Sequence, residues 1–107
     1  DNSDLSDALL FHRGIPSLLA ALQNHRHNSW VQGHACSALS NLALDREAHA
    51  AQIRRAEGIR HVSQALQDHP HDAWVRTQAC QGLSRLALVD EHARADVEER
   101  LDALDMS

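Results

Sequence analysis

Hydrophobic residues between Asn28 and Leu44 recur at spacings of three and four. They form one stripe, made of Val31, Ala35, Ala38, Leu39 and Leu42. This period predicts an amphipathic helix that buries one face, with Asn28 as its N-cap. The same pattern follows Asp72, where the stripe is Val75, Ala79, Leu83 and Leu86. The chain is therefore expected to contain two long helices of the same design.

The two helices belong to an internal repeat. Residues 25–44 return 44 positions later as residues 69–88, with 11 of the 20 positions identical, and the alignment of 1–44 with 45–88 gives 17 identities. A period of this length indicates a repeat architecture. We therefore divide a single domain, 1–107, into repeat one (1–44), repeat two (45–88) and a partial third repeat or capping helix (89–107). The register of that last part is open, since offsets of 44 and 45 both align.

Each repeat is predicted to form three helices. In repeat one, a short helix over 3–13 is capped by Ser3 or Asp4 and ends at Gly14, which supplies a left-handed residue. The second helix opens at Ile15 with Pro16 in its first turn and runs to 24. Repeat two has Asp45, Gly58 and Asp72 at the equivalent boundaries.

The repeats carry a recognisable motif. The segments "GIPSLLAALQ…WVQGHACSALSNLAL" and "GIRHVSQALQ…WVRTQACQGLSRLAL" resemble the armadillo repeat, and the resemblance covers essentially the whole chain. It implies an all-α, right-handed armadillo-type α-solenoid with three helices per repeat of about 44 residues. In that family the third helices line a concave groove, along which partners usually lie in extended form.

A second stripe runs beside the hydrophobic one on each long helix. Its members are Trp30, His34, Ser37 and Asn41 in repeat one, and Trp74, Gln78, Gln81 and Arg85 in repeat two. Three of these four positions differ between the repeats, whereas the hydrophobic stripe is nearly unchanged. Such a pattern is typical of a common scaffold that presents a variable face. We expect these eight residues to bind a partner protein or an extended peptide on the concave face.

The armadillo resemblance narrows this expectation. The Trp of the nuclear-import receptors matches Ser37 and Gln81, and their peptide-clamping Asn is kept at Asn41 but replaced by Arg85. These departures argue against binding of basic localisation signals. Two alternatives stay open: Trp30 and Trp74 pack only beneath the preceding loops, and Arg85 is merely solvated or salt-bridged.

Composition excludes several classes of protein. The net charge is −5, Lys is absent and no basic run occurs, so nucleic acid is not an expected partner. No apolar run reaches the roughly 18 residues of a membrane span and no signal-peptide pattern opens the chain, so the expected location is cytoplasmic or otherwise intracellular. Cys36 and Cys80 occupy equivalent positions and are expected to be small core residues in a reducing compartment.

Histidine pairs at 25–27 and 69–71 raise a weak metal alternative. His25, His27, His69 and His71 supply imidazoles, but neither pair has an obvious third ligand, so no metal is expected. An acid-sensing role is a second weak alternative. The chain lacks a Gly-rich phosphate loop and an activated nucleophile, so we predict neither an enzyme nor a cofactor.

Acidic residues crowd the end of the chain. They are Asp90, Glu91, Asp96, Glu98, Glu99, Asp102 and Asp105. We interpret them as a solvated helix face, with an acidic patch for a basic partner as the alternative.

Self-association through the repeat ends is the alternative function. Leu5, Leu9, Leu10 and Phe11 are apolar for an exposed end, and uncapped repeat ends expose apolar surface. In that case the chain is a structural segment of a larger armadillo protein or a homo-oligomer. A charge at Leu9 or Phe11 then changes the assembly state, whereas substitutions in the groove do not.

Overall fold

The computed structural model describes residues 14–105, and this part of the chain is all-helical, as predicted. The helices are α2 (Ile15–Asn24), α3 (Ser29–Asp45), α4 (Glu47–Arg55), α5 (Gly58–Asp68), α6 (Ala73–Val89) and α7 (Glu91–Asp105). The helix expected over 3–13, and with it Leu5, Leu9, Leu10 and Phe11, lies outside the described residues.

Local sequence explains where the long helices begin. The side chain of Asn28 accepts a hydrogen bond from the Val31 N–H at 3.2 Å, and Asp72 accepts one from the Val75 N–H at 3.0 Å. Both predicted N-caps are therefore confirmed. Pro16 lies in the first turn of α2, where its missing N–H leaves no hydrogen bond unmade.

The helix bounds fix the register of the last segment. Helices α3 and α6 begin and end 44 residues apart, and α7 begins 44 residues after α4. The offset of 44 is therefore the one that the helices follow. It makes Asp90 the equivalent of Arg46, because each residue is the N-terminal neighbour of its helix.

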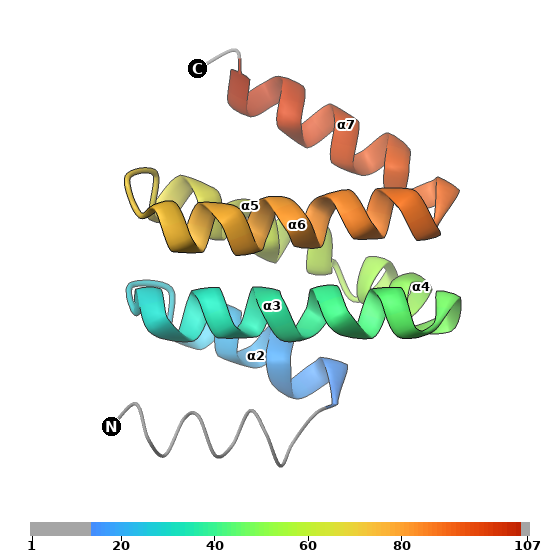
Figure 1. Ribbon diagram of the computed structural model, residues 1–107, viewed down its shortest axis with the longest axis horizontal. Coiled ribbons are helices and arrows are strands. Elements are labelled where there is room, and N and C mark those ends of the chain that lie inside the picture. Colours follow the sequence, from blue (N-terminus) through green and yellow to red (C-terminus); the bar gives the residue numbers. More distant parts are fainter. Residues whose placement is uncertain (1–13, 106–107) are drawn as a thin grey trace.

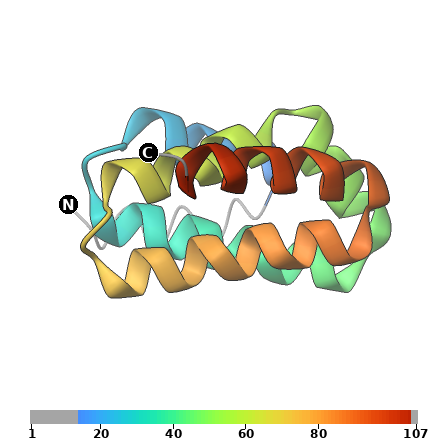
Figure 2. The same ribbon diagram turned by 90° about the horizontal axis from the view of Figure 1, so that it is seen from above.

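The helices form two layers (Figures 1 and 2). Helices α3 and α6 lie side by side in one layer, while α2, α5 and α7 lie in the other. Helix α4 packs near the C-terminal end of α3. The predicted hydrophobic stripes supply the core between the layers: Val31, Ala35, Leu39, Val75, Ala79, Leu83 and Leu86 are at most 1% exposed. Ala38 and Leu42 are half-buried at its edge.

The prediction of left-handed glycines is wrong. Gly14 is extended, with φ −66° and ψ 141°, and no glycine among the described residues has a positive φ. The left-handed residue between α4 and α5 is Glu57, at φ 63°. The next residue, Gly58, is the one pressed against α4: a Cβ there would overlap Cγ2 of Ile53 and lie 2.8 Å from the Ile53 carbonyl oxygen. Close approach, rather than φ, explains this glycine.

The two cysteines have different environments, which corrects the prediction for one of them. Cys36 is fully buried, with Gly82 of α6 beside its backbone carbonyl, and burial raises the pKa of the Cys36 thiol to about 12. Cys80 is exposed and lines a shallow surface hollow with Ala73, Arg76 and Thr77. Helix α7 packs against α6 but leaves the flank that carries Cys80 exposed.

This difference predicts selective thiol labelling. Native protein is expected to react rapidly with Ellman's reagent at Cys80 alone, and at both cysteines after unfolding, because only an exposed thiolate attacks the disulfide. The release of thionitrobenzoate, followed by its absorbance, measures the stoichiometry. Cys80→Ser should abolish the rapid phase and Cys36→Ser should retain it. Two rapidly reacting thiols in the folded protein would contradict the burial of Cys36.

Helix α7 is amphipathic, and its acidic residues divide into two groups. Glu91, Glu98, Glu99 and Asp102 are exposed, as predicted, and Asp96 is half-buried, while Ala93 and Val97 enter the core. Asp90 does not belong to the solvated face, which corrects the prediction: it is 7% exposed and accepts hydrogen bonds from Arg54 and from the first turn of α7. The side chain of Asp105 lies outside the part of the chain that the structure describes.

None of the helices between residues 14 and 105 combines the length and the apolar composition that crossing a membrane requires.

Candidate partner-binding surface

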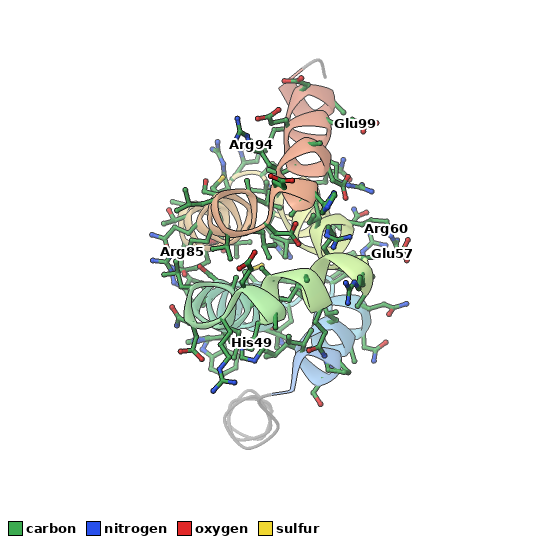
Figure 3. All side chains as sticks on the ribbon, turned by 90° about the vertical axis from the view of Figure 1, so that its right-hand side faces the viewer. His49, Glu57, Arg60, Arg85, Arg94 and Glu99 are labelled. Atoms are coloured by element: carbon green, nitrogen blue, oxygen red, sulfur yellow. The ribbon has the colours of Figure 1, made fainter. Side chains whose placement is uncertain are left out.

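The eight residues of the variable stripes lie on two neighbouring helices. Because α3 and α6 run side by side, the two stripes form one surface along the α3–α6 pair, which we call the α3–α6 surface. His34, Asn41, Trp74 and Gln81 are exposed, and Trp30, Ser37, Gln78 and Arg85 are half-buried. Figure 3 shows Arg85 between the two helices, on the side of this layer away from α4 and α5.

Three rings gather at the N-terminal end of the surface. The ring centroids of Trp30 and His34 are 4.3 Å apart, and those of His34 and Trp74 are 4.9 Å apart with an edge-on geometry. Contacts of this kind are favourable for aromatic pairs. His34 therefore joins the tryptophans of the two repeats into one aromatic cluster, of which Trp74 is 39% exposed.

Gly33 allows Trp74 to lie against α3. A Cβ at Gly33 would overlap the six-membered ring of Trp74, with Cη2 at 2.6 Å and Cε3 at 2.7 Å. A glycine inside a helix costs about 1 kcal/mol relative to alanine, so its presence here requires a packing reason. The ring of Trp74 therefore packs on α3 of the other repeat and still exposes 39% of its surface.

Hydrogen bonds hold Arg85 at the C-terminal end of the surface. One terminal nitrogen of its guanidinium, Nη1, donates to Ser40 Oγ at 2.8 Å and to Asn41 Oδ1 at 3.3 Å. Both acceptors lie on α3, so the bonds cross from repeat two to repeat one. The salt-bridged alternative for Arg85 is wrong, because no carboxylate of the described residues lies within 4.0 Å of it.

Gln32 positions the N-terminal half of the surface, and the sequence reading missed it. Its side chain is 1% exposed, and its amide nitrogen donates to the carbonyl oxygens of Leu22 and His25 at 3.1 and 2.9 Å. The Leu22 carbonyl lies in the last turn of α2 and has no partner within that helix, and the His25 carbonyl, at the C-cap, also accepts the Asn28 N–H at 3.1 Å. Gln32 thereby fixes α3 against the loop that precedes Trp30. The only sequence signal for a buried polar role of Gln32 was its position one residue after the core Val31. The equivalent residue of repeat two, Arg76, is exposed, so the repeat itself gives no such signal.

The histidine loops contact each other beside the aromatic cluster. Arg26 forms a bidentate ion pair with Asp68, and His69 Nε2 donates to the Arg26 carbonyl oxygen at 2.7 Å. The Arg26 hydrogen bond lowers the pKa of the Asp68 carboxyl. Among residues 14–105, no group of three or more His, Cys, Asp or Glu side chains is placed to hold a metal ion. The bond from His69 gives this histidine a role in joining the repeats.

Comparison of the chain with models of protein families, with curated proteins and with solved structures found no match.

Proposed function

We propose that this protein is a non-enzymatic interaction module of the armadillo type, a right-handed solenoid that binds a partner protein or extended peptide along the α3–α6 surface. The resemblance of both repeats to the armadillo motif supports this proposal. In that family the third helices, here α3 and α6, form the concave face.

One observation carries the proposal. The stripe residues of the two repeats come together as a single surface with an aromatic cluster at one end and Arg85 at the other. Exposed tryptophan and a positioned arginine are the residue types that dominate binding energy at protein interfaces. A surface needed for packing alone would not require the ring of Trp74 to be exposed.

The size of the surface suits a short segment. Trp74 and Arg85 lie on one helix, and a rise of about 1.5 Å per residue separates them by about 16 Å. An extended peptide advances about 3.3 Å per residue, so about five residues span the two ends. Ser37, Gln78 and Gln81 lie between them and offer hydrogen bonds to a peptide backbone.

Capture from native lysate tests the proposal. The double substitution Trp30→Ala/Arg85→Glu should remove specific partners, because it truncates one anchor and reverses the charge of another, with a loss of at least about tenfold in recovery. The control is Arg76→Glu, which makes the same charge change on the exposed opposite flank of α6. Circular dichroism establishes that all three proteins remain helical.

Self-association through the repeat ends is a second candidate. It is favoured by the uncovered flank of α6, where Cys80 is exposed although its equivalent Cys36 is buried, and by Leu88, which is 80% exposed. An unchanged set of captured proteins, together with a molar mass in light scattering that changes on Leu9→Asp or Phe11→Asp, would support this candidate over the first.

A further inference from the structure

We propose that Arg85 binds the carboxylate of an acidic side chain, so that the partner is an extended peptide with Asp or Glu about five residues from an aromatic residue. This inference rests on the proposed function and adds the chemistry and the spacing of the ligand.

Most arginines of the described residues are paired with a carboxylate. Nine arginines lie between residues 14 and 105, and six of them have a carboxylate within 4.0 Å. The other three are Arg55, Arg76 and Arg85. Arg55 and Arg76 are exposed, whereas Arg85 is half-buried. Arg85 is therefore the one arginine of the described residues that is partly withdrawn from water without a compensating negative charge.

The guanidinium of Arg85 uses only part of its hydrogen-bonding capacity within the described residues. Its bonds to Ser40 and Asn41 both come from Nη1. A guanidinium has five N–H groups, so the Nε–H and the two N–H groups of Nη2 have no partner among residues 14–105. The Nε–H and one N–H of Nη2 lie along one side edge of the fork, which matches the two oxygens of a carboxylate.

Arg26 shows this edge in use within the same molecule. Its Nε and Nη2 donate to the two carboxylate oxygens of Asp68 at 2.9 and 3.0 Å. The same edge of Arg85 is open, while Ser40 and Asn41 hold the guanidinium from the opposite side. A side chain fixed in this way loses less conformational freedom when it binds a ligand.

The other end of the α3–α6 surface carries the aromatic cluster. The aromatic cluster offers the exposed part of Trp74 and the edge of His34, which suit a planar aromatic side chain. The distance of about 16 Å to Arg85 then sets a spacing of about five residues in an extended peptide.

The net negative charge of the chain opposes binding of an acidic peptide, so a preference for one points to a single local cation. At −5 the protein repels an acidic ligand at long range. A preference for Asp or Glu can therefore arise only from direct contact with a local cation. It should disappear on substitution of Arg85 and survive substitution of Arg76, which lies on the same helix.

Selection from a displayed library of random 12-residue peptides tests the inference. Wild type and Arg76→Glu should enrich peptides with Asp or Glu four to six residues from Phe, Tyr or Trp. Arg85→Glu should lose this enrichment and select Lys or Arg at the same spacing. For one synthetic peptide from the wild-type selection, Arg85→Gln should weaken binding by about tenfold or more, as for loss of a hydrogen-bonded charge, and the Glu→Gln peptide should lose a similar factor.

The outcomes separate the two proposals. Peptides that bind wild type, are lost with Trp74→Ala and show the same acidic content with Arg85→Glu would overturn the inference and leave the binding surface standing. If wild type enriches no peptide beyond the level of Trp30→Ala/Arg85→Glu, both proposals fail. Circular dichroism of each variant excludes unfolding as the cause.

Discussion

Replacement of Gly58 by alanine is expected to lower the free energy of unfolding by about 2–3 kcal/mol, the upper part of the range of about 1–3 kcal/mol for inserting a carbon into a packed site. The new Cβ would overlap Cγ2 of Ile53 and approach the Ile53 carbonyl oxygen to 2.8 Å. Ile53 is fully buried and its carbonyl belongs to the backbone, so neither atom can move without disturbing the junction of α4 and α5. The gain in helix propensity, about 1 kcal/mol at most, offsets only part of this.

The equivalent glycine of repeat one is the matched control. A Cβ at Gly14 meets only Pro16 Cδ at 3.7 Å, and its extended backbone suits any residue, so Gly14→Ala should cost less than about 1 kcal/mol. Urea unfolding of both variants, followed by far-ultraviolet circular dichroism, measures the difference. Equal midpoints would mean that Gly58 is not held against Ile53 in solution.

These glycines illustrate what the sequence could predict. The repeat placed both near a helix boundary, and periodicity identified seven core positions that are at most 1% exposed. The reason for glycine at position 58 was predicted wrongly. Glycine is favoured both where φ is positive and where another chain segment packs closely, and a single sequence does not distinguish these two cases. The structure distinguishes the two cases: Glu57 takes the left-handed conformation, and Gly58 is the residue that packs closely against Ile53 of α4.

The cysteines show the limit of reasoning by equivalence. Position 36 is buried on α3, which packs along its length against α6 of the next repeat. Among the described residues, α7 follows α6 and packs against α5 and α6, and it leaves the flank of α6 that carries Cys80 open. A repeat therefore predicts the inward face of each helix better than the face between repeats, because burial of that second face requires a helix from the neighbouring repeat.

The candidate site was predicted as two parallel stripes, and its internal contacts were not. The period of the helix places Trp74 and Arg85 on one stripe. It does not show that Trp74 lies over Gly33 or that Arg85 reaches Ser40 and Asn41. Such contacts depend on the distance and register between α3 and α6. A mid-helix glycine facing a tryptophan from the next repeat is visible in the sequence only after the packing is known.

Replacement of Asp90 by alanine is expected to cost about 3 kcal/mol of unfolding free energy: about 1 kcal/mol for the lost cap and about 2 kcal/mol for an ion pair whose arginine is only partly buried. Asp90 Oδ1 accepts the N–H groups of His92 and Ala93 at 2.9 and 3.3 Å, and loss of such a cap costs about 1 kcal/mol. Its other oxygen accepts from Arg54 Nε at 2.9 Å, so the substitution also leaves a half-buried guanidinium without its carboxylate. Thermal or urea unfolding gives the value.

Asp72→Ala is the matched control, because Asp72 caps α6 and has no arginine partner among the described residues. It should cost only the capping share, about 1 kcal/mol. The difference between the two alanine variants then isolates the contribution of Arg54. Similar losses for Asp72→Ala and Asp90→Ala would show that the ion pair contributes nothing measurable.

The pH dependence gives a second test of the same pair. Burial raises the pKa of the Asp90 carboxyl, but the hydrogen bonds from Arg54, His92 and Ala93 outweigh it and leave the pKa below its ordinary value. The unfolded chain therefore takes up this proton at a higher pH than the folded one. The stability that the group contributes is complete above the ordinary carboxyl pKa and is lost as the pH falls through the lower, folded value. Asp90→Asn keeps the capping oxygen without the charge, so its deficit relative to wild type should be largest near neutrality and should shrink below about pH 4. A deficit that does not change with pH would mean that the carboxylate charge on Asp90 is not what stabilises the junction between α4 and α7.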